Sequence, residues 1–251
     1  MAEWRFLRGW TEAELETRLN ALEQAPLNFA APLEDLPGNR WRRYFTEAVI
    51  AQEPPGAPAP GGAFAKAWLA VLDYQFSDPS IVKAHFDPRS PFEGRTLLLE
   101  LRIFGLHFLC GTRITRLTER TDPGVCTERG FRYDTLAGHF EVGSEWFMLT
   151  QDQRTGEVRF RIQASWRPGT FPNFWSRWGF WLFGERFQLA WHRLAYLRLR
   201  KLSGATGNNL ARVPQGRRLV HAGSDLADPT LWSLQAPLPV LGATPSHESR
   251  D

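Results

Sequence analysis

Ionisable side chains are densest between Tyr133 and Glu145, and this stretch is the part of the sequence best suited to chemistry. His139 and Glu141 are two residues apart, so in an unbroken strand both side chains would project from one face. A histidine beside a carboxylate could carry out general acid–base catalysis or supply two metal ligands. His139, Glu141 and Glu145 are therefore the candidate catalytic residues. The alternative is structural, with these side chains satisfying backbone donors or pairing with arginines.

No metal or cofactor site is predicted. Two ligands do not complete a metal site, and the sequence has no HExxH motif or His/Cys cluster to supply a third. The glycine patterns of dinucleotide and P-loop sites and the GxSxG context of a serine hydrolase are also missing. The two cysteines, Cys110 and Cys126, cannot form a disulfide framework, which favours a reducing compartment. Because residues 1–10 lack an apolar run, we expect no secretory signal and a cytoplasmic protein.

Aromatic residues are concentrated in one segment. Nine Phe and Trp side chains fall between Phe171 and Trp191. A spanning helix needs about 20 mainly apolar residues, and Arg177, Glu185 and Arg186 interrupt this window, so no transmembrane segment is predicted. The spacing of the rings is typical of a helix that faces a core. The same segment could instead lie in a bilayer interface.

Helix signals mark four segments. Thr11 and Glu14 form a capping box at the start of a predicted helix over 11–25. Apolar residues at helical spacing predict helices at 64–72 and 175–202. The cap formed by Ser77, Asp78 and Pro79 predicts a further short helix that ends near residue 86.

Strand signals dominate the middle of the chain. Residues 158–165 alternate between apolar and polar side chains, which is typical of a strand with one buried and one solvated face. Gly111 interrupts a similar alternation and predicts a bulge. Strands are predicted at 41–52, 95–104, 106–118, 131–136, 144–151 and 157–166. Strands followed by a long helix predict an α+β fold in which an antiparallel sheet packs against that C-terminal helix, with further helices towards the N-terminus.

Length and charge limit the domain organisation and the class of partner. The 251 residues are expected to form one α+β domain over 1–202, followed by a Gly/Pro-rich extension over 203–251 that is disordered at its end. The formal net charge is only +3, and the basic residues are scattered, so nucleic-acid binding is not indicated. All but three of the 30 Lys and Arg residues are Arg, which favours pairing with carboxylates and stacking on aromatic rings.

Several of these segments together resemble the uncharacterised DUF1990 family. The resemblance rests chiefly on Gly130–Leu136 (GFRYDTL), Gly138–Phe147 (GHFEVGSEWF) and Val158–Pro168 (VRFRIQASWRP), and it covers most of residues 4–202. The order of sheet and helix also resembles the helix-grip proteins related to START and Bet v 1. That likeness implies a curved sheet closed by the C-terminal helix, with an apolar cavity between them.

Three classes of function are compatible with the sequence. The preferred one is a binding module for a lipid-like or aromatic small molecule, in which case the protein is not an enzyme and needs no cofactor. The second is an enzyme of the cyclase or hydratase type, with His139 as general base and Glu141 or Glu145 as its partner. The third is structural or peripheral-membrane association through the aromatic helix. The residues predicted to contact a ligand are Tyr133, Thr135, Phe147, Phe160, Arg167, Trp178, Trp181 and Trp191.

Overall fold

A computed structural model describes residues 3–30, 41–103, 105–169, 174–204 and 220–222, with only the backbone described for Tyr44, 174–187 and 220–222. Its nine strands form one antiparallel sheet in the order β2-β8-β7-β6-β5-β4-β3-β9, and β1 pairs with β5. The strands are β1 (Glu3–Phe6), β2 (Arg42–Gln52), β3 (Val82–Phe86), β4 (Thr96–Ile103), β5 (Leu106–Asp122), β6 (Cys126–Thr135), β7 (Glu141–Asp152), β8 (Glu157–Pro168) and β9 (Val220–Ala222). The helices are α1 (Glu12–Glu23), α2 (Ala63–Leu72) and α3 (Phe174–Gly204).

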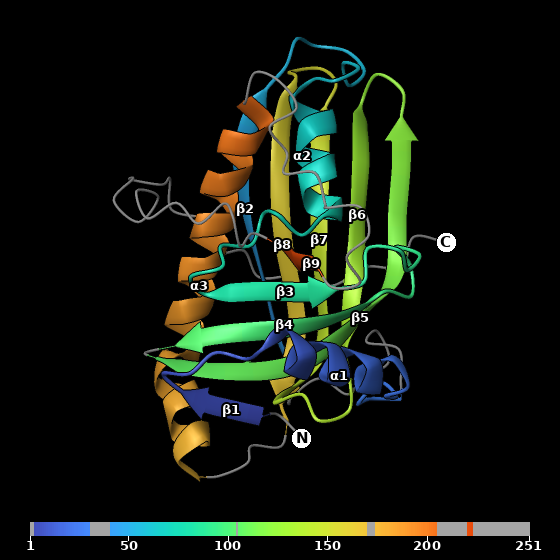
Figure 1. Ribbon diagram of the computed structural model, residues 1–251. Helices are drawn as coiled ribbons and strands as arrows, with labels where there is room; N and C mark the ends of the chain where they lie inside the picture. Colours follow the sequence, from blue (N-terminus) through green and yellow to red (C-terminus); the bar gives the residue numbers. More distant parts are fainter. Residues whose placement is uncertain (1–2, 31–40, 104, 170–173, 205–219, 223–251) are drawn as a thin grey trace.

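The sheet is strongly curved, so that β3 and β4 lie across β6, β7 and β8 (Figure 1). The long helix α3 runs beside the strands, and α2 packs against α3 and β7. Buried residues of the sheet, α2 and α3 form one large hydrophobic core. This arrangement confirms the predicted α+β, helix-grip-like fold with a C-terminal helix.

The two faces of the sheet differ in character because successive side chains of a strand point to opposite faces. On the inner face, which looks toward α2 and α3, Phe147 of β7 lies between Phe131 of β6 and Ile162 of β8. All three are almost completely buried. On the outer face, Arg161 forms an ion pair with Glu47 of β2 at 2.9 Å. The inner face is therefore the one that could enclose a ligand.

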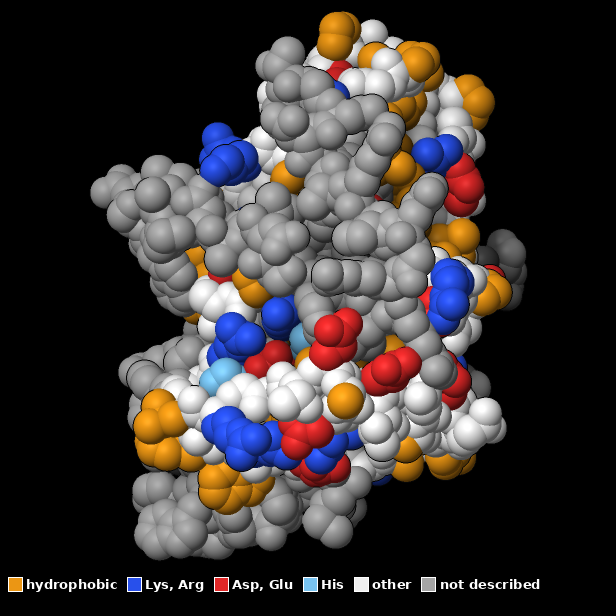
Figure 2. Space-filling model, viewed as in Figure 1, with side chains coloured by type: hydrophobic (Ala, Val, Ile, Leu, Met, Phe, Trp, Pro, Cys, Tyr) orange, Lys and Arg blue, Asp and Glu red, His pale blue; other side chains and the backbone are white. Residues whose placement is uncertain are grey.

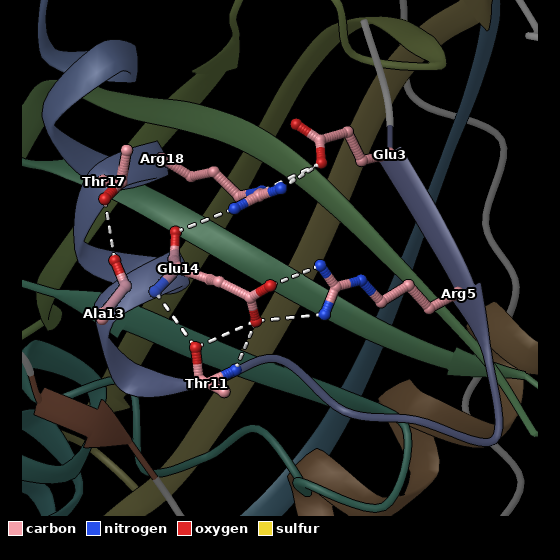
Figure 3. Close-up of polar contacts among 7 residues, drawn as sticks. All are labelled: Glu3, Arg5, Thr11, Ala13, Glu14, Thr17 and Arg18. Atoms are coloured by element: carbon pink, nitrogen blue, oxygen red, sulfur yellow. Dashed lines mark hydrogen bonds and ion pairs between the residues drawn. The ribbon is translucent and has the colours of Figure 1, made fainter.

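The N-terminal strand is held to α1 by charged side chains (Figure 3). Arg5 of β1 donates to Glu14 at 3.0 Å, and Arg18 of α1 donates to Glu3 at 3.0 Å. The guanidinium carbons of both arginines lie over the Trp10 ring, 3.8 and 4.3 Å from its centroid. These contacts join β1, which pairs with β5, to α1, which packs on the outer face of β4 and β5.

The helix start predicted at Thr11 is confirmed in its atomic detail. The Thr11 side chain accepts from the Glu14 backbone amide, and the Glu14 carboxylate accepts from the Thr11 amide at 2.8 Å. Leu15 and Leu19 then bury the inner side of α1 against Leu98 and Leu109. The capping box therefore sets both the start of the helix and the side that it turns to the sheet.

Two local predictions are wrong. Residues after Asp78 form a turn and then β3 instead of a helix, because Asp78 accepts from the Ser80 amide at 2.9 Å and the following residues pair with β4. The expected bulge at Gly111 lies instead between Ile114 and Arg116. At Gly111 a Cβ atom would come within 2.5 Å of the Leu22 side chain, so the glycine serves the close approach of α1.

The predicted C-terminal helix and extension are described in part. The helix predicted over 175–202 is confirmed as α3. Within the extension, β9 pairs with β3, with Ala222 opposite Ala84. The rest of the extension lies outside the described residues. No helix in the described part of the chain combines the length and the apolar character needed to cross a bilayer.

Charges of both signs occur on the face seen in Figure 2. Basic and acidic side chains lie beside one another over β3, β4 and α1. The buried carboxylate of Glu100 in β4 contacts Arg102 at 3.3 Å and His107 at 2.7 Å.

Candidate functional site

A buried carboxylate lies at the centre of the inner face. Glu145 of β7 lies directly opposite Tyr133 of β6 and Ala164 of β8, and it is 7% exposed. The Tyr133 hydroxyl donates to Oε2 of Glu145. The strand register therefore places an acidic group among the apolar side chains of the core.

Helix α3 completes a chain of polar contacts around Glu145. His192 Nε2 lies 3.7 Å from Glu145 Oε1, and His192 Nδ1 lies 2.7 Å from the Thr46 hydroxyl of β2. The Thr46 hydroxyl also contacts the Tyr196 hydroxyl. We call these five residues, Thr46, Tyr133, Glu145, His192 and Tyr196, the Glu145 cluster. It links β2, β6, β7 and α3 through buried side chains.

Aromatic rings surround the Glu145 cluster. The Phe147 ring centroid lies 5.3 Å from that of Tyr133 and 6.1 Å from those of Tyr74 and Trp191. Buried polar atoms in such surroundings are normally hydrogen-bonded. Oε1 of Glu145 is buried and has no hydrogen-bond partner among the described residues, whereas the Tyr74 hydroxyl interacts with Tyr133. One polar atom beside these rings is therefore available to a bound molecule.

The tyrosines beside Glu145 are held in their neutral form. Burial, together with the negative charge of Glu145, raises the pKa of Tyr133 and that of Tyr74 well above the usual range. Burial likewise raises the pKa of Tyr196. All three hydroxyls therefore remain hydrogen-bond donors at any physiological pH.

His139 has a place that differs from the expected one. It lies in the turn before β7, so the alternation that would put it on the same face as Glu141 does not apply. Its Nδ1 accepts the Glu141 backbone amide at 2.9 Å, and its ring lies 4.6 Å from that of Phe140. Burial lowers the pKa of His139 to about 3. The ring is therefore neutral and weakly basic, and it satisfies a backbone donor.

Glu141 shares the inner face of β7 with Glu145, four residues along the strand. Burial raises the pKa of Glu141 to about 8, and the charge of Glu145 adds to the effect. The side chain keeps partial exposure. Of the three catalytic candidates, the strand thus brings Glu141 and Glu145 to one face and leaves His139 in the preceding turn.

The residues predicted to contact a ligand are distributed unevenly. Tyr133, Phe147 and Trp191 surround Glu145, and Trp191 donates to Ser77 at 2.9 Å. Phe160 is fully buried deeper in the core. The side chains of Trp178 and Trp181 lie outside the described residues.

Two further predicted contacts have other partners. The Thr135 hydroxyl accepts from the Gly143 amide at 2.9 Å and donates to Asn28 at 2.6 Å, so it joins β6 to β7. Arg167 falls on the outer face of β8, where its guanidinium lies over the Trp41 ring at 5.6 Å. It therefore cannot anchor a molecule between the sheet and α3, and we do not retain it.

The sequence patterns missed three members of the Glu145 cluster, and two of them had a local signal. His192 and Tyr196 are four residues apart, which places both on one face of a helix. Thr46 had no such signal, because it reaches His192 only through the pairing of β2 with β8. Among the described residues, no three His, Cys, Asp or Glu side chains are placed to hold a metal ion.

The fold and its buried centre define the class of protein: a curved antiparallel sheet that grips a C-terminal helix and encloses a carboxylate among aromatic rings. The chain belongs to the DUF1990 family, a domain of unknown function, which it matches over residues 28–195. The matched region runs from just before β2 into α3 and includes every member of the Glu145 cluster except Tyr196. A comparison with curated proteins finds no match.

Solved structures with a related arrangement include a hypothetical protein from Helicobacter pylori, with 14% sequence identity and a TM-score of 0.41. That comparison covers 72% of this chain and 98% of the other. Major latex-like protein 151 from Panax ginseng is 11% identical with a TM-score of 0.36, covering 60% of this chain and 96% of its own. Ara h 8.0201 is 8% identical with a TM-score of 0.35, and the comparison covers 64% of this chain and 96% of the other. At these scores we base no functional argument on the likenesses.

Proposed function

We propose that this protein binds a small, largely apolar molecule between the inner face of the sheet and α3, with Glu145 as its polar anchor. The observation that carries the proposal is Oε1 of Glu145, which is buried among aromatic side chains and lacks a hydrogen-bond partner in the described part of the chain. Leaving a buried acceptor unpaired costs roughly 1–3 kcal/mol, and more when the group is charged. A ligand that donates a hydrogen bond to Oε1 would remove that cost.

The surrounding residues have distinct roles in this proposal. Tyr133 holds Oε2 and leaves Oε1, which lies 3.7 Å from His192 Nε2, to accept from the ligand. Phe147 and Trp191 supply apolar contact, as the rings of binding pockets generally do. Thr46 holds His192 through Nδ1, which keeps α3 in register with the anchor. The polar end of the ligand would thus lie near Glu145 and its apolar body against the rings.

The first test is saturable binding of a neutral apolar probe, N-phenyl-1-naphthylamine, followed by its fluorescence. We expect the wild-type protein to bind the probe and Glu145→Gln to bind it about tenfold more weakly, because a hydrogen bond to a charged group contributes about 1.5–3 kcal/mol. Glu157→Gln is the control, since Glu157 lies on the outer face and pairs with Arg159. Native mass spectrometry of the freshly purified protein checks for a co-purified small molecule. If no adduct is detected and the probe does not bind saturably, the proposal is contradicted.

A second candidate function is proton transfer to a bound molecule, as in cyclases and hydratases. It is favoured by the polar chain from Tyr133 through Glu145 to His192, because a carboxylate between a hydroxyl donor and an imidazole can exchange a proton with a ligand. The role first given to His139 would then fall to Glu145. If a ligand is found, its conversion by wild-type protein and its binding without conversion by Glu145→Gln would establish this activity.

A further inference from the structure

Charged side chains are distributed unequally between the two faces of the sheet near the proposed site. On the outer face, Arg161 pairs with Glu47 at 2.9 Å, and Arg132 pairs with Asp134 at 3.0 Å. On the inner face, β7 carries two carboxyl groups, those of Glu141 and Glu145. The side of β7 that faces the proposed ligand is thus acidic.

Few cations face these two carboxyl groups. In the described part of the chain, no Lys or Arg nitrogen forms an ion pair with Glu141 or Glu145, and His192 is the basic side chain nearest to Glu145, at 3.7 Å. Arg42 lies on the inner side of the edge strand β2, but it is exposed and its guanidinium lies over the Trp166 ring at 5.2 Å. At most one of the two carboxylates therefore has a cationic partner within the described residues.

The side chains around Glu145 also suit a positive charge. The faces of aromatic rings attract cations, and the Phe147 ring centroid lies 6.1 Å from that of Tyr74 and 5.3 Å from that of Tyr133. Oε1 of Glu145 is an indication of a ligand in its own right, since the residue is 7% exposed and this oxygen has no hydrogen-bond partner among the described residues. Carboxylates and ring faces together form the kind of surface that binds an ammonium group.

We propose that the ligand of this site is an organic cation, an amine or a quaternary ammonium on an apolar body, whose charged group lies between Glu145, Glu141 and the surrounding rings. This inference rests on the proposed function, because it names the chemical class of the molecule bound there. Attraction to a carboxylate is strong in a site of low dielectric, whereas an anion would be repelled by Glu145 and, above about pH 8, by Glu141 as well. The raised pKa of Glu141 is consistent with a carboxyl group that lacks a cationic partner.

The test compares probes that share a ten-carbon chain and differ in the charge of the polar end: decylammonium, decyltrimethylammonium, decanol and decanoate. Each is added below its micelle-forming concentration to displace bound N-phenyl-1-naphthylamine. We expect both cations to displace the probe at concentrations at least tenfold lower than decanol, and decanoate to be the weakest. Equal potency of decanol and decylammonium would overturn the cationic class and leave the proposed function standing. If no probe binds saturably, the proposed function itself fails.

Variants test whether the preference for cationic probes comes from the carboxyl groups of Glu141 and Glu145. Measured near pH 9, where Glu141 is ionised and decylammonium is still a cation, Glu141→Gln and Glu145→Gln should each reduce the ratio of cation to decanol affinity about tenfold, and Glu157→Gln should leave it unchanged. His192→Gln should preserve or increase the ratio, because it removes the one basic group beside Glu145. Circular dichroism verifies that each variant is folded. If Glu145→Gln does not fold, Glu141→Gln and the probe series still decide the question. An unchanged ratio in folded Glu141→Gln and Glu145→Gln would overturn the assignment.

Discussion

Glu141 shows how the placement of one side chain changes its acid–base chemistry. Burial raises its pKa from an ordinary 4.5 to about 8, so the folded chain holds the proton more tightly than the unfolded chain does. The stabilisation from the protonated form is complete below pH 4.5 and is lost as the pH rises to about 8. Above that pH the protein keeps a buried negative charge at a cost in stability.

From this we predict a pH-dependent gain in stability for Glu141→Gln in the ligand-free protein. The variant should match the wild type near pH 4.5 and exceed its free energy of unfolding by roughly 1–3 kcal/mol near pH 9, above the pKa of about 8, where the wild-type carboxyl is mostly ionised. Urea unfolding at intervals between these pH values measures the difference. Glu157→Gln serves as the surface control. A difference that stays constant across the range would show that Glu141 is not the group responsible.

The predictability of the site also differs from residue to residue. Glu145 and Tyr133 were singled out because ionisable groups are dense in that stretch of sequence, and the structure places both on the inner face. His139 does not share a strand face with Glu141, because strand β7 begins only at Glu141 and the alternation does not extend to it. His192 and Thr46 come from α3 and β2, and only the tertiary fold brings them to Glu145.

At the scale of elements, the contact between β7 and β8 depends on Gly143. A Cβ atom at this position would lie 2.2 Å from the Ser165 carbonyl oxygen and 2.7 Å from the Trp166 Cα atom. Both are backbone atoms of the paired strand, so neither can yield without loss of the pairing that places Glu145. A side chain at position 143 must therefore separate the two strands.

We accordingly predict that Gly143→Ala is strongly destabilising, by roughly 3 kcal/mol or more, since overpacking against backbone exceeds the usual cost of a core substitution. Soluble yield and urea unfolding measure the effect. Gly9→Ala is the matched control, because a Cβ atom there meets nothing within 4 Å. Similar stability of the two variants would mean that β7 and β8 can separate at Gly143 without cost.

Elements with strong internal periodicity were predictable, and those that depend on distant partners were not. The capping box of α1 and the alternation of β8 are local signals, and both agree with the structure. The cap at Asp78 is local too, but the residues after it are drawn into β3 by pairing with β4. β1 was missed because its four residues carry too little pattern, and it exists through its pairing with β5.

At the scale of the whole molecule, the large core can be followed along the described residues as far as α3. Among them, the last that pack in this core are Leu199 and Leu202. Beyond α3, β9 adds three residues to the edge of the sheet. The described core therefore does not include any part of the extension after Gly204.

We predict that a chain ending at Gly204 folds cooperatively, with a free energy of unfolding lowered by no more than about 2 kcal/mol through the loss of the few hydrogen bonds of β9. Thermal unfolding followed by circular dichroism tests this expectation for the domain boundary. Hydrogen exchange should become faster in β3, the strand that β9 covers, and remain unchanged in β7. Loss of a cooperative transition would place the extension inside the folded domain.

The pairing of β2 with β8 has a consequence for the synthesis of the protein. Arg42 lies opposite Trp166, and Gln52 lies opposite Glu157, so every contact of this pair joins residues far apart in the chain. Such distant pairs form slowly, because a long loop must close before any contact is gained. When the nascent chain has emerged from the ribosome only as far as β7, β2 still lacks its partner strand β8. The apolar residues of β2, Ile50 among them, are then exposed and prone to aggregation. We expect this protein to need chaperone protection until β8 has emerged.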